Sequence, residues 1–171
     1  RVLPTIRSRC RLIRAGAPTR EQSLEWLKSQ GVQEAERKLT EAGGMPLAVF
    51  DEDARFRLSD EMRERFLAYL KLGRAAPPAQ ALSVVDKDVT LSAAALFLSR
   101  WGWDLASAKV GCDPQYFPEF AEEIKAIAQA ASPAGLYTWI NSVRDIRRVA
   151  EHPLNAKTMI EALLISYARN I

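Results

Sequence analysis

The sequence predicts an all-α protein. In successive segments, apolar residues recur at intervals of three and four, which is the spacing of one face of a helix. Residues that cap or open helices precede most of these segments, and glycine or proline follows several of them. After residue 13 there is no strand pair, glycine-rich phosphate loop, internal repeat or low-complexity run. The 171 residues are 48% apolar and 26% charged, with no run of about 18 apolar residues, so we expect a soluble, cytoplasmic protein.

The first residues, up to about 13, are expected to be a strand end and a connector, followed by a linker at 15–18. Three short helices are then predicted. The first starts at Thr19 with a capping box to Gln22, and Gly31 ends it. The second covers about 33–42 and stops at a glycine pair, and the third starts at Pro46. In the first helix Leu24 and Leu27 share one face, in the second Ala35, Leu39 and Ala42 are expected to face inward, and the third carries Leu47, Val49 and Phe50.

Five or six further helices are predicted after a charged stretch, and we place a domain boundary near Arg55. The first is capped by Ser59 and carries two acids in its first turn, which suits the helix dipole. The others begin after Pro78, at Thr90, at Pro118, at Pro133 and at Asn155. Residues 90–110 are apolar on nearly all sides, so this helix is expected to be central.

Trp101 and Trp103 lie in that central helix and have two interpretations. Paired aromatic side chains can form a stacking platform for nucleic-acid bases. Only Arg100 and Lys109 accompany them as basic residues, which favours packing in a core instead.

The basic charge is concentrated at the start of the chain. The first twenty residues hold six arginines and no acid, and the rest holds 18 basic and 21 acidic residues. This distribution argues against a general DNA-binding surface on the body of the protein.

No metal site is expected. Cys10 and Cys112 lie far apart with no metal-binding spacing, and the single histidine, His152, lies at a predicted helix end.

Residues 5–11 read TIRSRCR and include the triplet Ser8-Arg9-Cys10. This triplet resembles the SRC motif of the clamp-loader branch of the AAA+ ATPases. Residues 3–10, LPTIRSRC, are similar to the δ′ subunits of bacterial DNA polymerase III. In that family the segment ends the ATPase core, and its arginine points into the nucleotide site of the adjacent subunit. The resemblance therefore implies that Arg9 is an arginine finger supplied in trans. A planar, permanently charged guanidinium suits that role because it forms paired hydrogen bonds to phosphate oxygens.

The resemblance also implies a domain organisation. Residues 1–14 would be the end of the AAA+ core, 15–55 a three-helix lid, and 56–171 a five- to six-helix collar that joins the subunits. The chain would then be the C-terminal part of a longer protein. ATP-binding relatives place a phosphate-sensing arginine at the start of the third lid helix, where this chain has Pro46. Proline offers no donor to a phosphate, which favours the δ′ type over the γ/τ type.

The function implied is that of an accessory, non-catalytic subunit in DNA replication. It would bind no cofactor itself, because ATP would be bound by the neighbouring subunit. Its partners would be γ/τ and δ subunits and, through the whole complex, the sliding clamp and primed DNA. The interface candidates are Trp101, Trp103 and Tyr167, since the helices of 56–171 carry wide apolar faces. Three alternatives stay open: a nucleic-acid-binding module whose N-terminal arginines hold phosphates, a γ/τ-type subunit, and a helical scaffold unrelated to replication.

Overall fold

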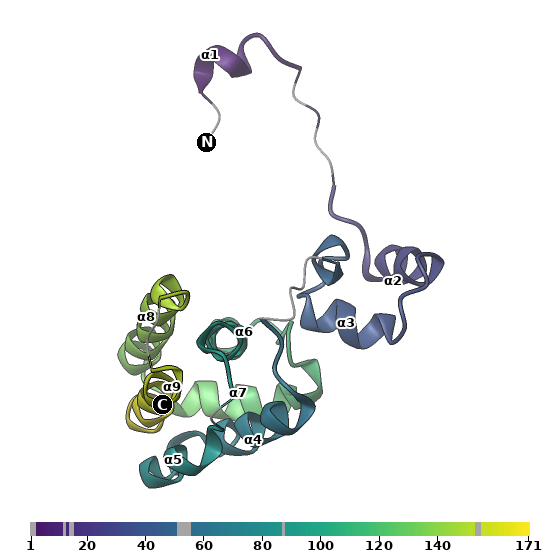
Figure 1. Cartoon of the computed structure of the whole chain (residues 1–171). Coiled ribbons are helices and arrows are strands. Elements are labelled where there is room, and N and C mark those ends of the chain that lie inside the picture. The colour runs from purple at the N-terminus through teal and green to yellow at the C-terminus, as the bar shows by residue number, and fades with distance from the viewer. Residues whose placement is uncertain (1–2, 12, 14–15, 51–55, 87, 153–154) are drawn as a thin grey trace.

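The computed structural model describes residues 3–11, 13, 16–50, 56–86, 88–152 and 155–171 (Figure 1). Helices make up its regular structure, and no described residue lies in a strand, so the predicted all-α class is confirmed. None of the helices in the described ranges is both long and apolar enough to cross a membrane. The elements in chain order are α1 (Pro4–Arg7), α2 (Arg20–Ser29), α3 (Ala35–Glu41), η1 (Leu47–Val49), α4 (Asp60–Leu70), η3 (Gly73–Ala75), η4 (Pro78–Gln80), α5 (Ala81–Val84), α6 (Leu91–Lys109), η5 (Pro118–Phe120), α7 (Ala121–Ala130), α8 (Pro133–Val149) and α9 (Ala156–Asn170).

Helix α6 is the centre of the larger unit, which we call the helical body (residues 56–171). It contacts α7, α8 and α9, while α9 also contacts α5. Four large side chains of α6 are buried in one continuous apolar core: Phe97, Leu98, Trp101 and Leu105. The prediction that this apolar helix is central is therefore confirmed.

Four aromatic side chains with polar atoms connect the helices inside this core. The indole Nε1 of Trp101 donates to the Tyr167 hydroxyl at 3.3 Å, and that hydroxyl donates to the Leu70 carbonyl at 2.7 Å. Trp139 Nε1 likewise donates to the backbone of α9, and the Tyr69 hydroxyl donates to it as well. Burial raises the pKa of Tyr167 well above its ordinary value, so its hydroxyl remains a donor. These bonds join α4, α6, α8 and α9 through groups that water cannot reach.

Replacing Tyr167 with phenylalanine should lower the free energy of unfolding by about 1–3 kcal/mol, because two buried groups lose their partner. Urea denaturation of the two proteins measures this difference. Tyr137→Phe is the matched control, since Tyr137 lies on α8 and is exposed, and it should leave the stability unchanged. Equal unfolding midpoints for wild type and Tyr167→Phe would show that the hydroxyl is not a structural link.

Five helices begin as the sequence predicts or within a residue of it, each with a polar side chain at its N-cap. The complete capping box of Thr19 and Gln22 is present at α2. The other N-cap side chains that accept a backbone hydrogen bond are Ser59, Thr90, Ser132 and Asn155.

Residues 19–50 form a second, smaller unit, which we call the small unit. Leu27, Ala35 and Leu39 form its buried centre. Its first two helices confirm the prediction, although α3 starts at Ala35 because Glu34 has a left-handed backbone (φ 53°). Of the third predicted helix, the described residues show a 3₁₀ turn.

Up to Phe50, the last described residue before 56, this segment forms the 3₁₀ turn η1, and its Leu47 is exposed. A three-residue turn has room for one inward side chain, and Val49 takes that place against the small core. Phe50 is also exposed on one side and meets Trp26 edge-on, with ring centroids 5.6 Å apart. The predicted domain boundary near Arg55 lies outside the described residues.

The start of the chain also differs from the prediction. Residues 4–7 form the one-turn helix α1 and not a strand end, while residues 1, 2 and 12 lie outside the described ranges. Pro4 suits the first turn of a helix, and no described strand offers a partner for a ladder. Figure 1 shows α1 apart from both helical units. We call residues 3–13 the arm.

Candidate functional site

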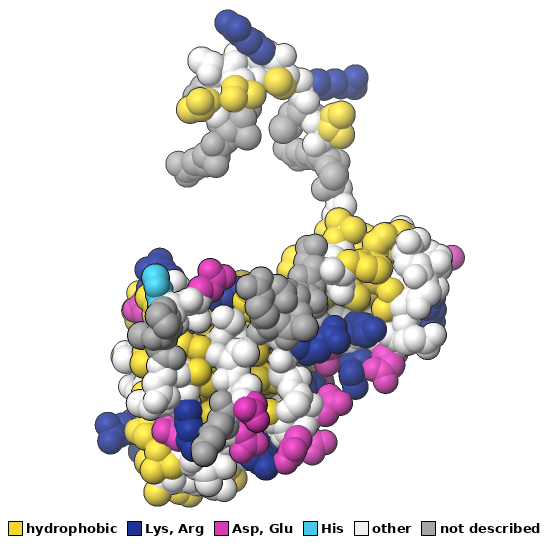
Figure 2. Space-filling view, in the orientation of Figure 1, with side chains coloured by type: hydrophobic (Ala, Val, Ile, Leu, Met, Phe, Trp, Pro, Cys, Tyr) yellow, Lys and Arg dark blue, Asp and Glu magenta, His cyan; other side chains and the backbone are white. Residues whose placement is uncertain are grey.

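The arm holds the Ser8-Arg9-Cys10 triplet on a tight turn that follows α1. The Ser8 hydroxyl donates to the Thr5 carbonyl at 3.1 Å, and the Arg9 backbone N–H donates to the Ile6 carbonyl at 3.1 Å. These two bonds fix the local backbone and leave the side chain of Arg9 exposed. Within the described ranges, the Arg9 guanidinium has neither an ion pair nor a hydrogen bond. The turn therefore presents a free cation away from the helical units, as Figure 2 shows for the arm.

Apolar side chains accompany the cations of the arm. Leu3, Ile6 and Ile13 are all exposed, and the exposed basic residues Arg9 and Arg11 lie between Ile6 and Ile13 in the chain. Exposed apolar groups next to arginines are typical of a segment that packs against another protein surface.

Pro46 lies at the start of η1 and has neither a backbone N–H nor a side-chain donor. Before it, Gly43 and Gly44 adopt left-handed backbones with φ of 64° and 76°. The backbone N–H groups of Gly43 and Gly44 already donate to the Thr40 and Leu39 carbonyls, at 2.9 and 2.8 Å.

The small unit touches the helical body at Gly43. The Gln115 side-chain amide donates to the Gly43 carbonyl, and a β-carbon on Gly43 would lie 2.6 Å from the ring of Tyr116. Glycine is therefore needed here both for its left-handed backbone and for the close approach of Tyr116. We call this contact the junction.

A buried carboxylate on α6 holds the loop that makes the junction. Asp104 is fully buried, and its two oxygens accept from the backbone N–H groups of Gln115 at 2.9 Å, Tyr116 at 2.9 Å and Phe117 at 2.8 Å. Burial raises the pKa of the Asp104 carboxyl above its ordinary value, and the three N–H groups partly offset that rise. With both oxygens accepting, the ionised form satisfies all three donors.

Sequence reasoning did not single out Asp104, although a signal was present. It is the one acid in the apolar run 91–105, and a buried acid is rare unless it is paired or hydrogen-bonded.

The three residues predicted to lie in an interface differ in their exposure. Trp101 and Tyr167 are fully buried in the core and offer no surface to a partner, which corrects their assignment as interface residues. Trp103 is 59% exposed and remains a candidate, and Val110 and Tyr137 are exposed as well.

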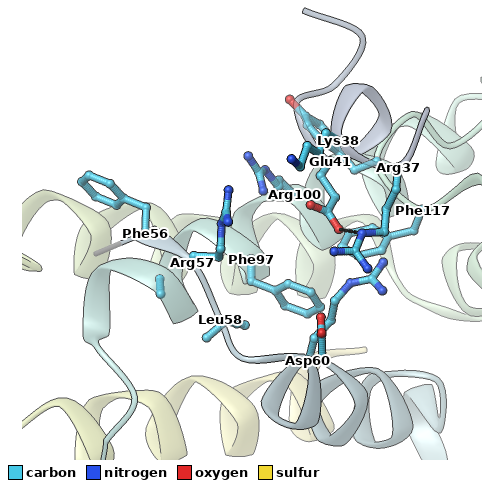
Figure 3. A pocket seen from close by; sticks show the side chains of 13 residues that line it. Arg37, Lys38, Glu41, Phe56, Arg57, Leu58, Asp60, Phe97, Arg100 and Phe117 are labelled. Atoms are coloured by element: carbon cyan, nitrogen blue, oxygen red, sulfur yellow. Dashed lines mark ion pairs between the residues drawn. The ribbon is translucent and has the colours of Figure 1, made fainter. Parts of the chain in front are cut away.

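Basic side chains from both units line a pocket beside the junction (Figure 3). They are Arg37, Lys38, Arg57, Arg63 and Arg100.

Among the described residues, no three His, Cys, Asp or Glu side chains are grouped so that they could hold a metal ion. Cys10 and Cys112 are exposed free thiols.

No protein-family model matches this chain, and no curated protein or solved structure matches it either.

Proposed function

We propose that this chain is the C-terminal part of a δ′-type clamp-loader subunit, and that Arg9 completes the ATP site of a neighbouring subunit. The observation that carries the proposal is the Ser8-Arg9-Cys10 turn, in which a cation is exposed on an arm apart from the helical units. An arginine finger that acts in a neighbouring subunit must extend beyond its own domain. Its charge must not be neutralised by an acidic group of its own domain. A guanidinium that has no partner within the described chain meets both needs.

In this proposal the small unit is the AAA+ lid and the helical body is the collar. The chain performs no catalysis and binds no cofactor; its neighbours bind ATP, and the complex acts in the cytoplasm on the sliding clamp and primed DNA. Pro46 supports the δ′ type, because an ATP-binding subunit needs a donor at that turn.

The exposed apolar residues of the helical body support assembly through the collar. Trp103 on α6 and Tyr137 on α8 are exposed by 59% and 68%, and α6 packs directly against α8. Large aromatic side chains exposed on packed helices are typical of surfaces that permanent complexes bury.

We expect the 171-residue chain to co-elute with γ/τ-type and δ subunits when they are expressed together. Trp103→Glu should abolish co-elution because it places a charge in an apolar interface. Met45→Glu is the control, since Met45 is also an exposed apolar residue but lies in the small unit. Size-exclusion chromatography with light scattering measures both. A wild-type chain that never co-elutes would contradict assembly, and a loss with Met45→Glu alone would place the interface in the lid.

A second candidate function is nucleic-acid binding through the arm. The observation in its favour is that Arg9 and Arg11 are exposed in a segment free of acidic residues. Binding of an oligonucleotide that is lost in an Arg9→Ala, Arg11→Ala double variant would favour it.

A further inference from the structure

The small unit and the helical body have separate apolar cores. Leu27, Ala35 and Leu39 form the buried centre of the small unit, and the described residues of the other core all lie between 58 and 171. Helices α2 and α3 of the small unit pack on each other. Because the two cores are not continuous, the orientation of the small unit on the helical body depends on contacts at the surface between them.

On the small unit, the junction is built on a residue that cannot move by itself. Gly43 is buried, and its backbone N–H donates to the Thr40 carbonyl at the end of α3. The next backbone N–H, that of Gly44, donates to the carbonyl of Leu39, whose side chain belongs to the small core. A displacement of Gly43 therefore moves α3 and the small core with it.

The helical body contributes a loop that is fixed in the same way. Asp104 accepts hydrogen bonds from the three consecutive backbone N–H groups of residues 115–117. Phe117 is buried and packs edge-on against Trp101, with ring centroids 5.4 Å apart. The loop therefore moves together with α6, the central helix of the body.

The contact between these two fixed parts is small and open to water. The Gln115 side chain, which donates to the Gly43 carbonyl, belongs to an exposed residue. The Tyr116 ring lies against Gly43 at the position that a β-carbon would occupy, and Tyr116 is partly exposed as well. Water can replace the partner of an accessible hydrogen bond, so this contact can open without leaving a buried donor unsatisfied.

A cleft between the two units lies beside the junction. Arg37 and two acids line it from the small unit, and Arg63 and Glu119 line it from the helical body. On the first wall Arg37 pairs with Glu34 at 3.1 Å and with Glu41 at 3.6 Å. On the second wall Arg63 pairs with Glu119 at 3.1 Å. Each of these ion pairs joins residues of the same unit, so a wider cleft leaves all of them intact.

From these observations we infer that the junction is a latch. It fixes the orientation of the small unit on the helical body, and the two units turn against each other as rigid bodies when it opens. Gln115 and Tyr116 are the positioning residues, and they act on Gly43. The inference does not depend on the clamp-loader proposal, because it concerns the two helical units and none of its residues belongs to the arm.

The test measures the distance between the two units in the 171-residue chain. Cys10→Ser and Cys112→Ser remove the two exposed thiols. Glu25→Cys on α2 and Glu123→Cys on α7 then introduce exposed positions for nitroxide labels. Double electron–electron resonance gives the distribution of distances between the labels, and we expect a single narrow distribution while the latch is closed.

Opening the latch should widen that distribution. The Gln115→Ala, Tyr116→Ala double variant removes both positioning side chains and should broaden the distribution about twofold or more. Gln115→Ala alone changes an exposed residue and should broaden it in part. The matched control is the Gln129→Ala, Tyr137→Ala double variant, which removes the same two side chains from exposed positions on α7 and α8 and should leave the distribution unchanged. Thermal unfolding of each variant, followed by circular dichroism, checks that both units remain folded.

Identical distributions for the labelled parent protein and both Gln115 variants would overturn the inference, because other contacts would then hold the two units together. The inference also fails if the labelled parent protein already shows the broad distribution, or if the control variant broadens it as much as the Gln115→Ala, Tyr116→Ala variant does. If that double variant unfolds, Gln115→Ala alone decides between these outcomes.

Discussion

Replacing Asp104 with alanine should lower the free energy of unfolding by about 3–5 kcal/mol, since three backbone N–H groups lose their acceptor together. A buried donor left without a partner costs about 1–3 kcal/mol; the Phe117 donor is buried and the other two are partly buried, and water entering the vacated space recovers part of the sum. Asp104→Asn should also be strongly destabilising, because the amide group directs N–H donors at backbone N–H groups. Urea denaturation monitored by circular dichroism gives both values.

Asp113→Ala is the matched control for Asp104. Asp113 lies near the same loop and pairs with Lys125 at 2.9 Å, but its side chain is 87% exposed. Its loss should cost less than about 1 kcal/mol. In addition, hydrogen exchange at residues 115–117 should become much faster in Asp104→Ala than in the control. A loss of stability below about 1 kcal/mol for Asp104→Ala, with unchanged exchange, would show that the carboxylate does not hold the loop.

The local features of this fold could be predicted from the sequence because short-range interactions determine them. The capping box of Thr19 and Gln22 and the N-caps Ser59 and Asn155 involve residues three positions apart. The central place of 91–109 follows from its apolar composition alone.

The features that were missed depend on contacts between distant parts of the chain. The bond from Gln115 to Gly43 spans 72 positions, and no periodicity reveals such a pair. Trp101 and Trp103 have the same chemistry and lie two positions apart, yet they point to different sides of α6. Burial of Trp101 is decided by Tyr167 and Phe117, which lie on other elements. The pocket residues come from α3, α4 and α6, so the sequence alone does not show that they lie close together.

Under the proposed function, replacing Arg9 with alanine should have the largest effect of all, and the effect should appear at the ATP site of a neighbouring subunit. An arginine finger stabilises the charge that develops on the transferred phosphoryl group, and its loss slows hydrolysis at that site by about 10³-fold or more. The bulk rate of a complete loader should fall only partly, because its other ATP sites have fingers of their own. Assembly should be unaffected, since Arg9 lies on the arm and outside the helical body.

Arg11→Ala is the matched control, because Arg11 is an exposed arginine of the same arm, two positions beyond Arg9. It removes the same charge and tests whether general electrostatic attraction explains the effect. Arg9→Lys provides a second comparison: it keeps the charge but loses the planar fork, so it should restore little activity.

The most direct measurement uses the complete protein in a reconstituted loader whose other ATP sites are inactivated, so that only the site facing Arg9 turns over. DNA-dependent ATP hydrolysis is then measured for wild type, Arg9→Ala and Arg11→Ala. The proposal predicts a loss of about 10³-fold for Arg9→Ala and a near wild-type rate for Arg11→Ala. Equal rates for all three proteins in a fully assembled complex would contradict the assignment of Arg9 as a trans arginine finger.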